Sequence, residues 1–162
     1  MEIRDRVLGL LQKNARLSHN EIAERLDIAV DEVEQIVKDS EANKTIYGYY
    51  TLINEDSLGR QPVRALIEVG VQPERDGGFD HVARLLSKFS EVTDVVLVSG
   101  SFDLQLVIVG ETLQDVASFV ASKLAPMDGV RSTRTHFMLK KYKEAGFQVE
   151  EDEDYERLSV AP

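Results

Sequence analysis

The sequence predicts an α+β protein, in which an N-terminal winged-helix-like helix-turn-helix of three helices precedes a C-terminal ferredoxin-like βαββαβ domain. Apolar residues recur at helical spacing through the first 44 residues and alternate with period two in the stretch that begins at Val63. A polar segment between them, "NEDSLGRQP", contains residues that favour turns. We therefore expect a helix-turn-helix domain at 1–44, a hinge strand and linker at 45–62, a ferredoxin-like domain at 63–145 and an acidic tail at 146–162.

Three short helices account for the first domain. Ile3, Val7 and Leu11 form one apolar stripe, and "SHNE" at residues 18–21 is a capping box that begins a second helix. Asp31 is suited to cap the third. The second and third helices are separated by about four residues, which fits a helix-turn-helix but also a plain helical bundle. Spacing alone leaves DNA binding open.

The hinge, "TIYGYYTLI", is rich in β-branched and aromatic residues and predicts a strand. We expect it to link two subunits of a dimer. The alternative is an ordinary connecting strand within one subunit, and the pattern does not separate the two.

The second domain shows the order β-α-β-β-α-β. A strand begins at Val63, a helix follows Phe79, "DVVLVS" and "LQLVIV" are strands joined by "GSFD", Thr112 caps the next helix, and a final strand runs from Val130 to about Lys140. In this pattern two helices cover one face of a four-stranded antiparallel sheet. Because 95–98 and 106–109 are apolar on both faces, we expect the other face to be buried in a homodimer.

Composition excludes several classes of protein. The chain has no cysteine and therefore no disulfide or thiolate metal site. Its net charge of −10, half of which comes from residues 150–162, argues against nonspecific nucleic-acid binding. No apolar run approaches the roughly 20 residues of a membrane helix, so we expect a cytoplasmic protein with no membrane partner. His19, His81 and His136 are scattered and no nucleophile or phosphate-binding motif occurs, so we expect neither an enzyme nor a cofactor or metal site.

Four segments in this order resemble the Lrp/AsnC (feast/famine) family of transcriptional regulators: "LLQKNARLSHNEIAERL", "IYGYYTLIN", "LVSGSFDLQLVIVG" and "DGVRSTRTHFMLKKYK". The resemblance implies a helix-turn-helix joined to a ferredoxin-like domain that assembles into homodimers and often octamers and binds amino acids between subunits. Double-stranded DNA and a small-molecule effector are the implied partners. The implied function is sequence-specific transcriptional regulation in response to an amino acid or related metabolite.

The third helix departs from the family pattern. The family commonly has Arg in place of Ile36, a basic residue in place of Asp39, Leu in place of Ser40 and Gly in place of Lys44, whereas "AVDEVEQIVKDSEANK" is rich in acids. A second interpretation is therefore an amino-acid-binding oligomer whose acidic helical domain has lost DNA binding or acts through a paralogue.

If the helix does read DNA, the side chains left facing the groove are Asp31, Glu32, Gln35 and Lys38. Gln35 could bind adenine and Glu32 could accept from cytosine, each worth roughly 1–3 kcal/mol of discrimination. The candidate phosphate contacts are the amides that begin the second helix and the side chains of Lys13, Arg16, Arg25, Lys38 and Lys44. Because this set is small, we expect weak monomeric binding that oligomer avidity strengthens.

"VSGSFD" (98–103) is an ordinary hairpin turn by its residues alone. The family resemblance implies that it lines the effector pocket, through Ser99, Gly100, Ser101, Phe102 and Asp103. Amides around Gly100 would hold a carboxylate, Asp103 would face an ammonium group, and Phe102 would serve as a lid or as core. Thr133 and Thr135 share a face of the last strand and would supply hydroxyls from a neighbouring subunit.

Overall fold

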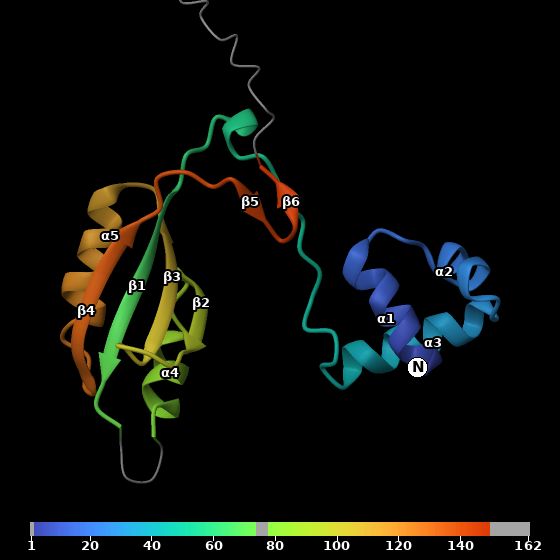
Figure 1. Ribbon diagram of the computed structural model, residues 1–162, viewed down its shortest axis with the longest axis horizontal. Coiled ribbons are helices and arrows are strands. Elements are labelled where there is room, and N and C mark those ends of the chain that lie inside the picture. The colour runs from blue at the N-terminus through green and yellow to red at the C-terminus, as the bar shows by residue number, and fades with distance from the viewer. Residues whose placement is uncertain (1, 74–77, 150–162) are drawn as a thin grey trace, which may run out of the picture. The chain divides into compact units, whose positions relative to one another are not determined.

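The computed structural model describes residues 2–73 and 78–149, so most of the predicted acidic tail lies outside the described residues. The chain forms two compact units, Met1–Ile53 and Asn54–Pro162 (Figure 1). Each unit has its own apolar core.

The first unit consists of helices α1 (Ile3–Lys13), α2 (His19–Leu26) and α3 (Val30–Ala42). Their apolar stripes meet in a core of Val7, Leu17, Ile22, Ala23, Val33 and Val37. The predicted capping box is confirmed: the Ser18 hydroxyl accepts from the Glu21 amide at 3.3 Å, and the Glu21 carboxylate accepts from the Ser18 amide at 2.8 Å.

The predicted cap of α3 is wrong. The helix begins at Val30 and its N-cap is Ala29, which makes no side-chain hydrogen bond to the helix. Asp31 and Glu32 lie inside the first turn instead. There the carboxylates can still interact favourably with the positive end of the helix dipole.

The predicted hinge strand does not form within the single chain, since residues 47–54 contain no helix or strand. Tyr47 and Tyr50 are 93% and 77% exposed. The Tyr49 hydroxyl donates to the Glu41 carboxylate at 2.9 Å, and burial together with this contact raises the pKa of Tyr49. A strand needs the backbone of a second segment to pair with, and local sequence cannot supply one.

The second unit has the predicted βαββαβ order. Its elements are β1 (Val63–Val71), α4 (Asp80–Leu86), β2 (Val92–Leu97), β3 (Leu104–Gly110), α5 (Leu113–Phe119) with a π-helical turn η2 (Val120–Leu124), and β4 (Val130–Phe137). All three strand pairs are antiparallel and the sheet order is β2-β3-β1-β4, as a ferredoxin-like domain requires. The last strand ends at Phe137 rather than near Lys140, and a small hairpin follows, β5 (Lys143–Glu144) with β6 (Phe147–Gln148).

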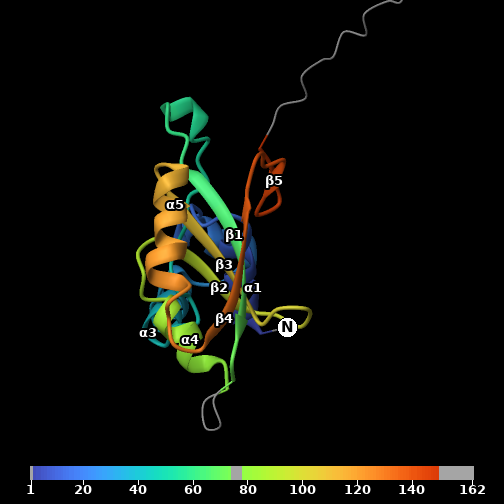
Figure 2. The same ribbon diagram turned by 90° about the vertical axis from the view of Figure 1, so that its left-hand side faces the viewer.

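Helices α4 and α5 lie on one side of the sheet (Figure 2). Beneath them is a core that includes Ala65, Ile67, Val69, Val82, Leu104, Leu106 and Phe119. We call the other side the open face; by strand register it carries Leu66, Glu68, Val96, Gln105, Val107, Arg134 and His136. Its apolar members are half-buried or exposed, and Glu68 lies 3.1 Å from His136 and 3.4 Å from Arg134.

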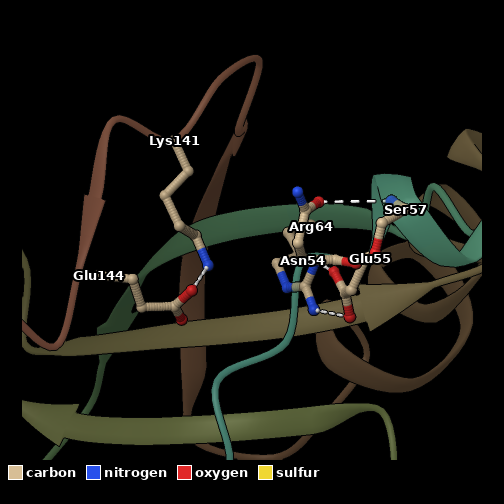
Figure 3. A network of polar contacts seen from close by, with 6 residues as sticks. All are labelled: Asn54, Glu55, Ser57, Arg64, Lys141 and Glu144. Atoms are coloured by element: carbon tan, nitrogen blue, oxygen red, sulfur yellow. Dashed lines mark hydrogen bonds and ion pairs between the residues drawn. The ribbon is translucent and has the colours of Figure 1, made fainter. Parts of the chain in front are cut away.

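Polar contacts hold the start of the second unit against the sheet (Figure 3). Arg64 on β1 makes two hydrogen bonds to the Glu55 carboxylate, at 2.5 and 2.7 Å, and these lower the pKa of Glu55. The Ser57 hydroxyl donates to the Asn54 carbonyl at 2.7 Å, which closes the turn of η1 (Asp56–Leu58). Lys141 and Glu144 form a separate ion pair at 2.5 Å beside the small hairpin.

Candidate DNA-binding and effector sites

The solvent-facing surface of α3 carries all four predicted base-contacting residues, Asp31, Glu32, Gln35 and Lys38, and each is exposed. The Gln35 amide donates to the Asp39 carboxylate one turn later at 2.8 Å. To bind an adenine edge, this amide would have to exchange Asp39 for the base. Because both groups are exposed, the exchange costs little.

The start of α2 is less suited to a phosphate than its position suggests. The Ser18 amide already donates to Glu21, and this hydrogen bond is the main reason that the pKa of Glu21 is lowered. The site therefore holds an ionised carboxylate where a DNA phosphate would approach. This leaves the exposed cations Lys13, Arg16 and Arg25 as the stronger phosphate candidates in this part of the unit.

Lys44 lies just after α3 with φ of 63°, in the left-handed region. The chain reverses here, and the Ile46 amide donates to the Ser40 carbonyl at 2.9 Å, so that Ile46 packs against the helical core. A left-handed residue at a helix end is usually glycine, because it has no Cβ to clash. This geometry gives a physical reason for the family's glycine, and it places the exposed lysine in strained backbone.

The predicted effector hairpin, residues 98–103, is closed by a hydrogen bond from the Val98 amide to the Asp103 carbonyl at 2.9 Å. The Asp103 carboxylate accepts from the Val71 amide at 2.8 Å and lies 3.4 Å from the Arg131 guanidinium. Asp103 therefore joins the hairpin to the end of β1 and the start of β4. The sequence analysis missed Arg131, and the available signal was a basic residue at the start of the final strand.

The remaining candidates for the effector site differ in their exposure and in their position on the sheet. Ser99, Gly100 and Ser101 are exposed, and Phe102 is half-buried. Thr133 and Thr135 pair with Val69 and Ile67, so they lie on the helix-covered side of the sheet at its β4 edge. Within the part of the chain that the structure describes, no hydrogen bond joins either threonine to the hairpin.

The structure describes residues 2–73 and 78–149. They contain no group of three or more histidine, aspartate or glutamate side chains that could hold a metal ion. Among these same residues, none of the helices has the length and apolar character needed to cross a membrane.

Two sequence families match the two units. Residues 2–39 match a winged helix-turn-helix DNA-binding domain, and residues 64–146 match the Lrp/AsnC ligand binding domain. The chain belongs to the Lrp/AsnC family. It is a helix-turn-helix transcriptional regulator with a ligand-binding domain, and this family consists of regulators rather than enzymes.

Relatives match over most of the chain. The Bacillus subtilis helix-turn-helix regulator YugG is 42% identical, covering 96% of this chain and 95% of its own. LrpA of Pyrococcus horikoshii is 33% identical, over 85% of this chain and 94% of its own. Both are described as helix-turn-helix-type transcriptional regulators.

Solved structures share the fold. The leucine response regulatory protein of Mycobacterium tuberculosis aligns with a TM-score of 0.74 at 19% identity, covering 93% of this chain and 99% of its own. A regulator of Neisseria meningitidis, solved as a complex with L-Met, aligns with a TM-score of 0.69 at 24% identity, covering 89% and 92%.

Proposed function

We propose that this regulator binds a specific double-stranded DNA sequence as a homodimer through α3 and the cations around it, and that an amino acid bound at the 98–103 hairpin changes this binding. The observation that carries the proposal is the open face of the sheet. Neither α4 nor α5 covers it, yet Leu66 and Val107 lie paired at its centre. A second copy would bury this apolar pair.

Among the charged residues of the open face, which also include the exposed Asp94 beside Val107, Glu68 does not oppose such an interface. Glu68 already has Arg134 and His136 as partners in its own chain, so burial would enclose a paired carboxylate. The hinge supports the same assembly, because its exposed tyrosines and unpaired backbone offer a second segment to a partner's hinge. Paired helix-turn-helix units would then read two half-sites, and dimers could assemble further into octamers.

DNA recognition would depend on few contacts per subunit. Each phosphate neutralised adds roughly 0.9 to the slope of log affinity against log salt, and the candidate cations on each subunit are Lys13, Arg16, Arg25, Lys38 and Lys44. Gln35 and Glu32 would supply base discrimination from the exposed face of α3. The acidic residues around them, such as Glu34 and Asp39, would weaken binding to other sequences and so favour specific over nonspecific DNA.

The hairpin offers charges of both signs to an amino acid. Asp103 would accept from the ammonium group, while Arg131 and the amides around Gly100 would bind the carboxylate. The L-Met complex of the Neisseria relative supports an amino acid as the class of ligand. Thr133 and Thr135 would contribute from a neighbouring subunit at the sheet edge. The ligand must bind one assembly more tightly than another, since equal affinity would shift nothing.

The test is fluorescence anisotropy of the full chain with DNA from upstream of its own gene, across a salt series and with an amino-acid panel. We expect a sequence preference, a steep salt slope and loss of the preference in Gln35→Ala. Gln12→Ala, which truncates an exposed glutamine on α1, is the matched control. Sedimentation should show a dimer that Leu66→Asp dissociates.

A second candidate rests on the acids of α3, where Asp31, Glu32, Glu34, Asp39 and Glu41 outnumber Lys38. In this version the protein is an amino-acid-binding oligomer whose helical unit does not bind DNA by itself, or does so only when mixed with a paralogue. Weak binding with no sequence preference, together with an intact dimer and an amino-acid response, would favour it over the regulator.

A further inference from the structure

A groove of about 280 Å³ lies beside α5 at the end of β3. Its floor is apolar, formed by Ile108, Val116 and Phe119, and Ser118, Ser122, Lys123 and Glu91 stand at its rim. The effector hairpin precedes β3, whereas the groove lies at the strand's far end, Ile108–Gly110. Seven strand residues span about 20 Å, so the two sites are separate.

Three charged side chains line the groove: Lys123, Glu91 and Asp115, whose carboxylate already accepts from the Thr112 amide and hydroxyl at the start of α5. The Lys123 ammonium donates to the Glu91 carboxylate, and this contact is the main reason that the pKa of Glu91 is lowered. The ammonium also lies 5.5 and 5.7 Å from the ring centres of Phe89 and Phe119, which pack edge to face. The aromatic rings favour a positive charge at this point.

The π-helical turn Val120–Leu124 puts Lys123 at the rim. The turn is closed by the Ala125 amide, which donates to the Val120 carbonyl at 2.8 Å. Continued α-helical spacing from Val116 and Phe119 would direct residue 123 into the core. The extra residue of the π-turn places Leu124 there instead, fully buried, and leaves Lys123 outside. Such turns are rare and occur frequently at functional sites.

We propose that this groove binds a small zwitterion with an apolar body, the chemical class of an apolar α-amino acid, with its carboxylate on Lys123 and its ammonium on Glu91. The ligand separates Lys123 from Glu91, so that its own two charges alternate with theirs. The apolar side chain of the ligand then lies over the floor of the groove. Glu91 disfavours a simple anion, and Lys123 disfavours a simple cation. The volume lies just below the roughly 300–1,000 Å³ of drug-sized pockets, which suits a ligand of this size.

This site goes beyond the proposed function, which places the effector at the hairpin. It gives one subunit two ligand sites at opposite ends of β3. An amino acid at the groove would act on the contact between α5 and the sheet, which is close: a Cβ at Gly110 would lie 3.1 Å from the Asp115 Cβ and 3.2 Å from a Val116 methyl.

The experiment uses the full chain, with L-leucine and L-methionine as probes and with N-acetyl-L-leucine and isopentylamine as matched compounds that each carry one charge. Binding is measured by thermal shift and titration calorimetry, and it is located by methyl NMR at Ile108 and Val116. The variants are Lys123→Gln and Glu91→Gln. Lys88→Gln removes an exposed lysine outside the groove as control, and Asp103→Asn alters the hairpin.

We expect a probe amino acid to shift the Ile108 and Val116 methyl signals in the wild type, in Lys88→Gln and in Asp103→Asn. Affinity at these methyls should fall roughly tenfold or more in Lys123→Gln and in Glu91→Gln, because each removes a charge-assisted hydrogen bond. The reversed pair Lys123→Glu with Glu91→Lys should recover part of the binding, without the contribution of the aromatic rings, and a purely structural role of the ion pair would not produce this recovery.

Three results would overturn the proposal that the groove binds an amino acid. These are no methyl shift with either amino acid, equal binding of the singly charged compounds, or methyl shifts that survive both single substitutions. An amino-acid response that Asp103→Asn removes and Lys123→Gln leaves intact would keep the hairpin site and reject the groove. A response that Lys123→Gln removes and Asp103→Asn leaves intact would keep the groove site and reject the hairpin site. Failure of the groove proposal and failure of the hairpin proposal are therefore distinguishable.

Discussion

Replacing Lys44 by glycine should stabilise the first unit while weakening its contact with DNA. Lys44 has φ of 63°, and the reversal there allows Ile46 to pack on the core. A non-glycine residue pays about 1–2 kcal/mol for this backbone conformation. Glycine removes that strain but loses about 0.5–1 kcal/mol through its more flexible unfolded chain.

The net expectation for Lys44→Gly is a gain of about 0.5–1 kcal/mol. In domains of 60–100 residues each kcal/mol moves the melting temperature by about 4–8 °C, so a rise of a few degrees should be measurable. At the same time each subunit loses one candidate phosphate contact. The salt slope of DNA binding should therefore fall by about 0.9 per subunit.

The assay is urea unfolding followed by circular dichroism, with amide hydrogen exchange at Ile22 and Val37 to assign the change to the first unit. Lys44→Ala is the matched control, because it removes the same charge and keeps the Cβ. The salt slope of DNA binding should fall by the same amount in both variants. Only Lys44→Gly should raise the free energy of unfolding.

Equal unfolding free energies for Lys44→Gly and Lys44→Ala would refute the strain argument. An unchanged salt slope in both would instead remove Lys44 from the DNA contacts and leave the strain argument untouched. The two readouts therefore test the local backbone and the proposed interface separately.

Three further changes test the second unit. Thr112→Ala removes the capping box in which the hydroxyl accepts from the Asp115 amide at 3.1 Å, and should cost about 1 kcal/mol in urea unfolding, whereas Thr112→Ser should cost less. Gly110→Ala should cost about 1–3 kcal/mol because the new Cβ meets the start of α5, while Gly48→Ala, which has open space, should be nearly neutral. The Arg64 hydrogen bonds lower the pKa of Glu55 from its ordinary value of 4.5, so the stabilisation they provide is present above about pH 4.5 and is lost as pH falls through the lowered pKa. Melting temperatures measured from pH 3 to 7 should show this loss in the wild type and a smaller one in Glu55→Gln.

Local sequence signals predicted most of the fold but only parts of the candidate sites. The capping box at Ser18 and the cap at Thr112 depend on near neighbours, and both were correctly predicted; the reciprocal contact of Asp115 that completes a second capping box at Thr112 was not. The cap at Asp31 was wrong because helix ends are set within one or two residues by packing as well as by side-chain type. The candidate DNA-facing surface of α3 was predicted from helical spacing, and its residues are exposed as expected, whereas contact with bases stays a prediction.

The amino-acid sequence by itself determined the order of α1–α5 and β1–β4 and the two separate cores, because periodicity and capping act between near neighbours. Tertiary structure decided which distant groups meet. It paired Asp103 with Arg131, placed Lys123 beside Glu91 through a π-helical turn, and put Lys44 in left-handed backbone so that Ile46 could reach the core. These contacts join residues whose approach depends on how the whole sheet and its helices pack, and no local pattern encodes that packing.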